Sequence, residues 1–276
     1  MADVEERVAA HYGVGDLVAS IKAALEAAGV DLAAAKPGDL KGVDEFHTGG
    51  LEATEALLDQ LDVSRDMAVL DIGSGLGGTA RHMAGRFGVS VVGVDLTPAY
   101  VDAAADLSAM VGMSDRTEFR VGSALAMPVA EGRFDLATMF HVGMNIADKR
   151  ALMAEVARVL VPGGRFALFD VMRGPEEGDL PFPFPWAEEA AFSFVERPAV
   201  YREAAEAAGL ARVAERDRRD FALDFFAAIE EAGGPPPVGI HLLMRETGPQ
   251  KIQNYVAAAK AGLIAPVEMI FEKQGA

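Results

Sequence analysis

The chain has 276 residues, enough for one large α/β domain with appended segments but not for two independent enzymes. Apolar residues make up 51% of it, so the chain can bury a sizeable core and is not disordered as a whole. Its 42 acidic and 25 basic residues give a net charge of −17, which makes nucleic acids and anionic membranes poor partners, whereas a cationic small molecule would be attracted. The absence of cysteine excludes disulfides and cysteine-ligated metals.

The amino-terminal region is expected to be helical. Residues 3–33 are rich in alanine with apolar residues at helical spacing, interrupted by Gly13 and Gly15, and a further helix is predicted for Leu51–Leu61. We therefore expect a helical cap at 1–62 ahead of a core at 63–276. The first residues are acidic where a targeting peptide would be basic, and no apolar stretch reaches the ~18 residues of a membrane span, which predicts a cytoplasmic protein.

From Met67 onward, short apolar runs alternate with helical patterns. This alternation predicts an α/β fold with a doubly wound, Rossmann-like sheet of seven strands, paired in parallel with helices on both faces. The expected strands are Met67–Ile72, Val89–Asp95, Glu118–Gly122, Phe134–Phe140, Arg165–Val171, Leu210–Arg219 and Ala265–Phe271. The helices expected between them are Gly77–Phe87, Pro98–Met110, Asp148–Val159 and Pro198–Ala208.

Two late stretches interrupt this alternation and are expected to form a lid above one edge of the sheet. The first, about 174–196, contains four prolines, which exclude regular structure over most of it. The second, about 220–262, contains the run Gly233-Gly-Pro-Pro-Pro237 and a helical pattern from Gln250. Their aromatic residues either form an apolar or cation-accepting wall or only pack the lid onto the sheet: Phe182, Phe184, Trp186, Phe192, Phe194, Phe221, Phe225 and Phe226.

The first predicted strand ends in an acid and a glycine-rich turn, Asp71-Ile-Gly-Ser-Gly-Leu-Gly-Gly78. Glycines allow a tight turn and close approach to a ligand, and the following helix presents its positive N-terminus. The glycine spacing also fits a dinucleotide-binding fingerprint. However, Asp71 would repel a pyrophosphate and attract an ammonium group, and the chain lacks the length for a separate dehydrogenase substrate domain. The second predicted strand ends in Asp95, an acid suited to a ribose diol in either family.

This glycine motif, with an acid at the next strand end, resembles the class I S-adenosylmethionine-dependent methyltransferases. Gly122-Ser-Ala124 stands where that family has an adenine-binding loop, and Phe134-Asp-Leu136 and Leu160-Val-Pro-Gly-Gly164 stand at its fourth and fifth strands. His47-Thr-Gly-Gly-Leu-Glu-Ala-Thr54 upstream is similar to the phosphoethanolamine, sarcosine/dimethylglycine and tocopherol methyltransferase group. The resemblance implies an S-adenosyl-L-methionine cofactor and a small-molecule substrate.

The resemblance also implies cofactor-binding roles, residue by residue. Asp71 and the backbone at Gly73 and Gly75 would hold the amino-acid end of the cofactor, and His47 would close over its methionine moiety. Asp95 would accept hydrogen bonds from both ribose hydroxyls. Leu96, Ser123 and Ala124 would contact the adenine, and Phe140 would also contribute to the cofactor site. The family usually has Asp where this chain has Ser123.

His141 follows the fourth predicted strand, at the carboxyl edge of the sheet, where ligands bind in this architecture. It is the predicted catalytic base, titrating near neutral pH, unless it only positions the acceptor. In the phosphoethanolamine enzymes a histidine aligns with Asn145 and pairs with an N-terminal tyrosine. No tyrosine lies in the matching stretch before Phe46 here, so a phosphobase acceptor is disfavoured. The predicted substrate-binding residues are Asn145, Phe184, Trp186 and His241, and no metal is expected.

The predicted reaction is methyl transfer to an amine nitrogen, or to a hydroxyl or carbon of a hydrophobic metabolite. Two alternatives are a nicotinamide-dependent oxidoreductase and a non-catalytic regulator that binds S-adenosylmethionine. A nucleic-acid methyltransferase is disfavoured by the negative charge and by the absence of an Asn/Asp-Pro-Pro-Tyr/Phe run.

Overall fold

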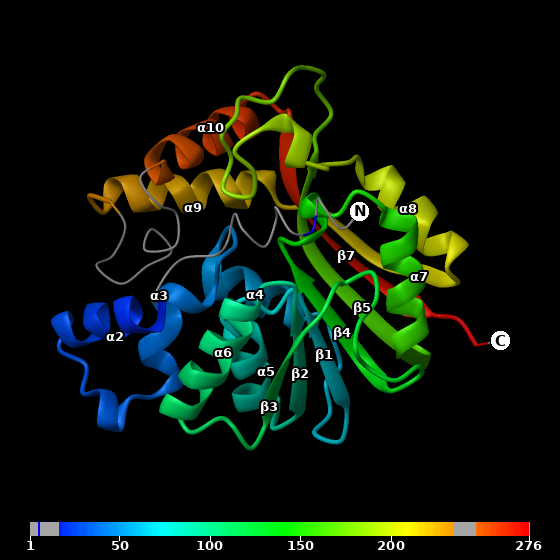
Figure 1. Ribbon diagram of the computed structural model, residues 1–276. Coiled ribbons are helices and arrows are strands. Elements are labelled where there is room, and N and C mark those ends of the chain that lie inside the picture. Colours follow the sequence, from blue (N-terminus) through cyan, green and yellow to red (C-terminus); the bar gives the residue numbers. More distant parts are fainter. Residues whose placement is uncertain (1–4, 6–16, 235–246, 276) are drawn as a thin grey trace.

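The computed structural model describes residues 5, 17–234 and 247–275. At its centre lies a seven-stranded sheet with the strand order β3-β2-β1-β4-β5-β7-β6 (Figure 1). This confirms the predicted α/β class and the Rossmann-like sheet. The strands are β1 (Ala68–Ile72), β2 (Ser90–Asp95), β3 (Thr117–Val121), β4 (Phe134–Phe140), β5 (Leu160–Arg173), β6 (Leu210–Asp217) and β7 (Ile264–Lys273).

The first five strands pair in parallel, as the sequence predicts. Alternate residues of each strand enter two different cores, so that Leu70 and Ile72 of β1 pack on one face and Val69 on the other. Because both faces are covered by helices, these strands are nearly continuous apolar runs. Their carboxyl ends meet at one edge, which brings the polar residues that follow β1, β2 and β4 close together.

The last strand departs from the doubly wound pattern, because β7 is antiparallel to both β5 and β6. β6 ends at the carboxyl edge, two residues short of the predicted Arg219, which instead begins α9 (Arg219–Glu231). Both α9 and α10 (Gly248–Lys260) lie above that edge (Figure 1). β7 therefore enters the sheet from the carboxyl edge, and its direction is reversed.

Helices cover both faces of the sheet. On one face, α4 (Gly50–Leu58) and α5 (Gly78–Phe87) bury Leu57 and Met83 against the strands. On the other, α7 (Lys149–Val159) and α8 (Pro198–Ala207) bury Met153 and Tyr201. α6 (Pro98–Met110) packs with α2 (Leu17–Ala27) in a third apolar cluster. Short helical turns complete the fold: η1 (Leu32–Ala34), η2 (Pro37–Leu40), α3 (Lys41–Asp44), η3 (Gly143–Asn145) and η4 (Ala190–Phe192).

The segment between α3 and α4 is tied to the carboxyl edge by a buried arginine. Arg81 on α5 is 1% exposed and donates hydrogen bonds to the carboxylate of Asp44 at 2.5 Å and to Ser108 on α6 at 3.0 Å. Burial raises the pKa of Asp44 to about 6, although Arg81 opposes the rise. Residues 43–50 are thereby held along the sheet edge, where the cavity described below opens.

Within the described ranges, no helix has both the length and the apolarity needed to cross a membrane. Nor do the side chains of these residues include a group of three or more His, Asp or Glu arranged to hold a metal ion.

Candidate active site

A cavity of about 240 Å³ lies at the carboxyl ends of β1, β2 and β4, and we name it the glycine-loop cavity. The fold brings together around it all nine residues that the resemblance assigns to a cofactor, although they come from five separate stretches of chain. These residues are His47, Asp71, Gly73, Gly75, Asp95, Leu96, Ser123, Ala124 and Phe140. Their individual roles stay predictions.

Two positions of the turn after β1 are occupied by glycine for different structural reasons. Gly73 has a φ of +70°, and a Cβ there would lie 2.2 Å from Cγ2 of Val142, so this position allows the loop after β4 to pack closely. Gly75 has a φ of +52°, and no atom lies within 4 Å of the place its Cβ would take. The backbone at Gly75 therefore faces open space that a bound molecule can fill.

Asp71 presents an unsatisfied carboxyl oxygen at this cavity. Its side chain is buried, and Oδ1 accepts a hydrogen bond of 2.8 Å from Thr138. Among the described residues, Oδ2 has no hydrogen-bond partner. Burial raises the pKa of Asp71 to about 7; the Thr138 hydroxyl opposes this rise, while the charges of Glu45 and Asp95 add to it. A buried acceptor without a partner is costly, so the site is suited to a ligand that brings a proton donor or a positive charge.

Asp95 shapes the loop as well as lining the cavity. Its Oδ2 accepts from the backbone N–H of Gly75 at 2.9 Å, and its Oδ1 accepts from that of Thr97 at 2.8 Å. Burial raises the pKa of Asp95, against the effect of these backbone hydrogen bonds. Because a carboxylate has about four acceptor positions, this side chain can still receive two hydroxyl groups from a ligand.

A carboxylate also lies beside Ser123, but it comes from a distant part of the chain. Oγ of Ser123 donates a hydrogen bond of 2.5 Å to Oε1 of Glu5, and Glu5 lines the cavity. The structure thus supplies an acid next to the position where the resembling family usually has Asp. The sequence contains no signal for this pairing, because the two residues are 118 positions apart.

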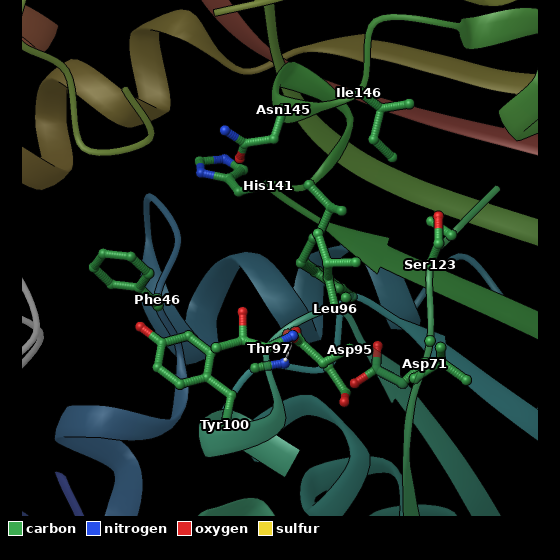
Figure 2. A pocket seen from close by; sticks show the side chains of 18 of the residues that line it. Phe46, Asp71, Asp95, Leu96, Thr97, Tyr100, Ser123, His141, Asn145 and Ile146 are labelled. Carbon is green, nitrogen blue, oxygen red and sulfur yellow. Dashed lines mark hydrogen bonds between the residues drawn. The ribbon is translucent and has the colours of Figure 1, made fainter. Parts of the chain in front are cut away.

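Figure 2 shows His141 and Asn145 set apart from the carboxyl groups of Asp71 and Asp95 across the cavity. Phe46 and Tyr100 also line the cavity, and the sequence did not mark either as a site residue.

A second space of about 40 Å³ adjoins the first, and we name it the aromatic chamber. It shares Phe46, His47 and His141 with the glycine-loop cavity, so these three residues form the wall between the two. Its other lining residues are Thr48, Met144, Pro185, Trp186, Phe225, Phe226, Ile252 and Tyr255. Of the eight aromatic residues expected either to form a wall or to pack the lid, Trp186, Phe225 and Phe226 line this chamber.

The predicted substrate-binding residues differ in where they lie. Trp186 lines the aromatic chamber, while Phe184 is wholly buried and stacks behind it with ring centres 4.5 Å apart. Asn145 lines the glycine-loop cavity, and its amide donates a hydrogen bond of 2.9 Å to the carbonyl of Trp186. His241 lies outside the described residues.

His141, in the wall between the two spaces, has a strained backbone conformation. It has a φ of +52°, which is unusual for a residue other than glycine, and its N–H donates a 2.7 Å hydrogen bond to the carbonyl of Phe169. Its Nε2 is buried and has no partner within the described ranges. Burial and then the charge of His47 lower the pKa of His141 well below its usual value. The expectation that it titrates near neutral pH is therefore wrong, because water does not stabilise its charged form here.

A buried lysine ties the loop after β4 to the lid. Lys149 is 3% exposed, and its Nζ donates hydrogen bonds to the carbonyls of Gly143 (2.9 Å), Ile146 (2.5 Å) and Phe194 (2.8 Å). Burial lowers its pKa to about 8, although the nearby Asp170 opposes this. The first two carbonyls belong to the loop that carries His141, and the third belongs to the first insertion, so one ammonium group holds both segments.

We expect Lys149→Met to lower the free energy of unfolding by about 3–5 kcal/mol, because it leaves the buried Asp170 without the nearby cation and removes one hydrogen bond from each of three carbonyls. Urea denaturation followed by circular dichroism measures this loss. Arg150→Met changes the exposed neighbour in the same helix and should have little effect. Equal stability of the two variants would contradict the anchoring role.

Comparison with known proteins agrees with this geometry. Residues 70–168 match the family described as Methyltransferase domain. The chain is 34% identical over 110 residues to tocopherol O-methyltransferase of Arabidopsis thaliana, covering 40% of this chain and 32% of that protein. It is 35% identical over 129 residues to phosphoethanolamine N-methyltransferase 3 of the same plant, covering 47% and 26%. These alignments span less than half the length of the curated relatives.

The fold is also shared with solved structures. Geranyl diphosphate C-methyltransferase from Streptomyces coelicolor A3(2), in complex with Mg²⁺, geranyl diphosphate and S-adenosyl-L-homocysteine, superposes with a TM-score of 0.66. It is 20% identical, and the match covers 80% of this chain and 78% of that one. The matched family region contains the last three residues of β1, among them Asp71, together with the glycine turn, Asp95 and His141. The region that matches the methyltransferase domain family, residues 70–168, therefore includes the greater part of the cavity wall.

Proposed function

We propose that this protein is an S-adenosylmethionine-dependent methyltransferase that acts on a small-molecule acceptor. The observation that carries the proposal is the junction of two spaces, in which the cavity lined by the predicted cofactor residues meets the aromatic chamber at His47 and His141. The cofactor, when bound, supplies a methyl group on a sulfonium, and the chamber offers a place for the acceptor opposite it.

The residues of the glycine-loop cavity fit this cofactor. Asp71 has a buried oxygen suited to the ammonium group of the methionine moiety, and Gly75 leaves room beside it. Asp95 has acceptor positions left for the two ribose hydroxyls. Leu96 and Ala124 offer apolar surface for the adenine.

The chain contributes to the reaction chiefly through positioning and the exclusion of water. Methyl transfer is an in-line displacement, so an acceptor held opposite the sulfonium reacts much faster than one that arrives by diffusion. The two insertions, 174–196 and 220–262, support a lid role, since Trp186 and Phe226 from them close the chamber. We assign the acceptance of a proton from the acceptor to Nε2 of His141, and its lack of a partner among the described residues supports this role.

The aromatic chamber favours a hydrophobic acceptor, which reacts at an amine nitrogen, a hydroxyl oxygen or a carbon. At about 40 Å³ the chamber admits the reacting end of such a molecule. The relatives named above act on tocopherol and phosphoethanolamine, so their shared chemistry supports a small metabolite without selecting one.

Titration calorimetry with S-adenosylhomocysteine tests the proposal. We expect binding by the wild-type protein and a roughly 10- to 100-fold loss for Asp95→Asn, since a hydrogen bond to a charged group is worth about 1.5–3 kcal/mol. Asparagine keeps an acceptor oxygen for one of the two backbone N–H groups, whereas alanine would remove both acceptors from the loop.

Binding of NADH in place of S-adenosylhomocysteine would contradict the proposal and favour the oxidoreductase alternative. Cofactor binding without turnover of any acceptor in a panel of phenols, enols and amines would favour the non-catalytic regulator.

A further inference from the structure

His47 is enclosed by hydrogen-bond acceptors. Its Nε2 lies 2.7 Å from Oε2 of Glu45 and 3.1 Å from Oγ1 of Thr54, and its Nδ1 lies 3.3 Å from the carbonyl oxygen of Thr48. The hydroxyl of Thr54 gives its own proton to Glu45 at 2.9 Å, so it offers His47 only a lone pair. An imidazole ring can donate from both nitrogens only when it carries two protons. This geometry therefore fits His47 as an imidazolium.

Glu45 is the matching buried carboxylate. It is 4% exposed, and its Oε2 receives hydrogen bonds from His47, Thr54 and, at 3.4 Å, Thr79. Burial alone would raise the pKa of Glu45, but the hydrogen bond and charge of His47 and the Thr54 hydroxyl outweigh burial and lower it. Both residues of the pair are thus suited to their charged forms.

Of the two residues in the ion pair, only His47 contacts the glycine-loop cavity and the aromatic chamber. His47 lines both the glycine-loop cavity and the aromatic chamber, whereas Glu45 lies behind it and lines neither. The His47 ring is held flat against Phe140, with ring centres 5.0 Å apart and planes 28° apart. The positive end of the ion pair therefore faces the chamber.

Glu45, behind the ring, is the counter-charge of His47, and the other groups that face the chamber add no further negative charge to it. Among the described lining residues, the titratable side chains besides His47 are His141 and Tyr255, and no Asp, Glu, Lys or Arg belongs to that set. Burial, with the charge of His47, keeps His141 neutral, and burial raises the pKa of Tyr255. Asp44 and Asp71 line only the glycine-loop cavity.

We propose, on the basis of the methyl-transfer function above, that Glu45 holds His47 as an imidazolium and thereby selects acceptors with an acidic hydroxyl on an apolar body, such as a phenol or an enol. A positive charge at the wall stabilises the oxyanion that such a hydroxyl forms, and it disfavours a protonated amine in the same place. The aromatic side chains of the chamber receive the apolar body.

The methylation step follows from these positions. The hydroxyl gives its proton to Nε2 of His141, and the electron pair of the oxygen forms the new bond to the methyl carbon. The electron pair of the broken carbon–sulfur bond stays on the sulfur atom. The products are a methyl ether, a neutral sulfide and a protonated His141, which passes its proton to solvent because its pKa is low. Glu45 acts through His47 and is a positioning residue.

Nitrogen-15 NMR of the histidine rings tests the charge on His47 directly. With S-adenosylhomocysteine bound at neutral pH, we expect both ring nitrogens of His47 in the chemical-shift range of protonated nitrogen, assigned by their loss in His47→Gln. Glu45→Gln should return one nitrogen to the unprotonated range. The matched control is Glu55→Gln, which removes the carboxylate 3.9 Å from His82 and should leave His47 unchanged. An unprotonated nitrogen on His47 in the wild-type protein would overturn the proposal.

The acceptor class is tested with 4-nitrophenol, whose anion absorbs visible light, and 4-nitrobenzylamine, which is a cation at neutral pH. Added to the wild-type complex with S-adenosylhomocysteine below the pKa of the phenol, 4-nitrophenol should bind as its anion, at least about tenfold more tightly than the amine. Equal or tighter binding of the amine would refute the selection. Failure of the methyltransferase proposal is a separate result, since the complex with S-adenosylhomocysteine would then not form in calorimetry.

Discussion

His141→Ala is expected to lower kcat by roughly 10²–10⁴-fold, the usual contribution of a general base, while the affinity for the cofactor changes little. The reason is geometric, because Nε2 of His141 is buried without a partner in the described part of the chain and the ring lines both spaces. Initial rates with an acceptor that is turned over measure kcat, and calorimetry measures cofactor affinity. His82→Ala, on α5 and outside both spaces, is the control.

The pH dependence separates a base from a residue that only positions the acceptor. A base must be neutral, so activity is lost as pH falls through its pKa in the folded protein. Because burial and the charge of His47 lower the pKa of His141, the wild-type rate should stay level through the ordinary histidine value of ~6.5 and fall only at more acid pH. A loss confined to KM, with the pH profile intact in His141→Ala, would show that the residue only positions the acceptor.

Asp71→Asn should weaken binding of S-adenosylhomocysteine by roughly 10²–10³-fold. We expect the Asp71 carboxylate to pair with the ammonium group of the ligand away from water, and removing one partner of a buried ion pair costs about 3–5 kcal/mol. Calorimetry measures the change. Asp135→Asn is the matched control, since Asp135 accepts from the backbone of Ala68 at the opposite, amino edge of the sheet.

The affinity should also depend on pH in a defined direction. Without ligand the pKa of Asp71 is raised to about 7, so below that value the carboxyl is protonated and must lose its proton to pair with the ammonium. Affinity is therefore expected to rise with pH up to about 7 and then to level off. This dependence should disappear in Asp71→Asn, and a dependence that persists unchanged would assign the titration to another group.

The parts of this fold that could be predicted from the sequence are those specified by local pattern. β1 precedes a Gly-rich turn, β2 ends in Asp, and β4 is an apolar run followed by His141. Both the position of these strands and the edge that carries the site therefore follow from the residues themselves. β5 begins at Leu160, five residues before the predicted Arg165. Gly163, at a φ of +79°, lies where the pairing with β4 changes register, so the chain forms a bulge within a continuous strand.

The parts that could not be predicted depend on contacts between distant segments. The direction of β7 depends on which edge of the sheet the second insertion covers, and no local pattern encodes that. Glu5, Lys149 and Tyr255 reach the site or its supports from sites far apart in the chain. Glu45 is only two residues from His47, but a pair of charged residues on an irregular segment gives no signal that both will be buried.

The place of β7 between β5 and β6 has a consequence for how the protein is made. A ribosome delivers β5 and β6 before residues 264–273 emerge, and no other strand of the sheet pairs with the edges that these two strands leave open. Such edges present rows of unpaired N–H and C=O groups that can pair with another chain. The nascent protein must therefore remain partly open until nearly all of its described residues have been synthesised, and protection by chaperones matters most in that interval.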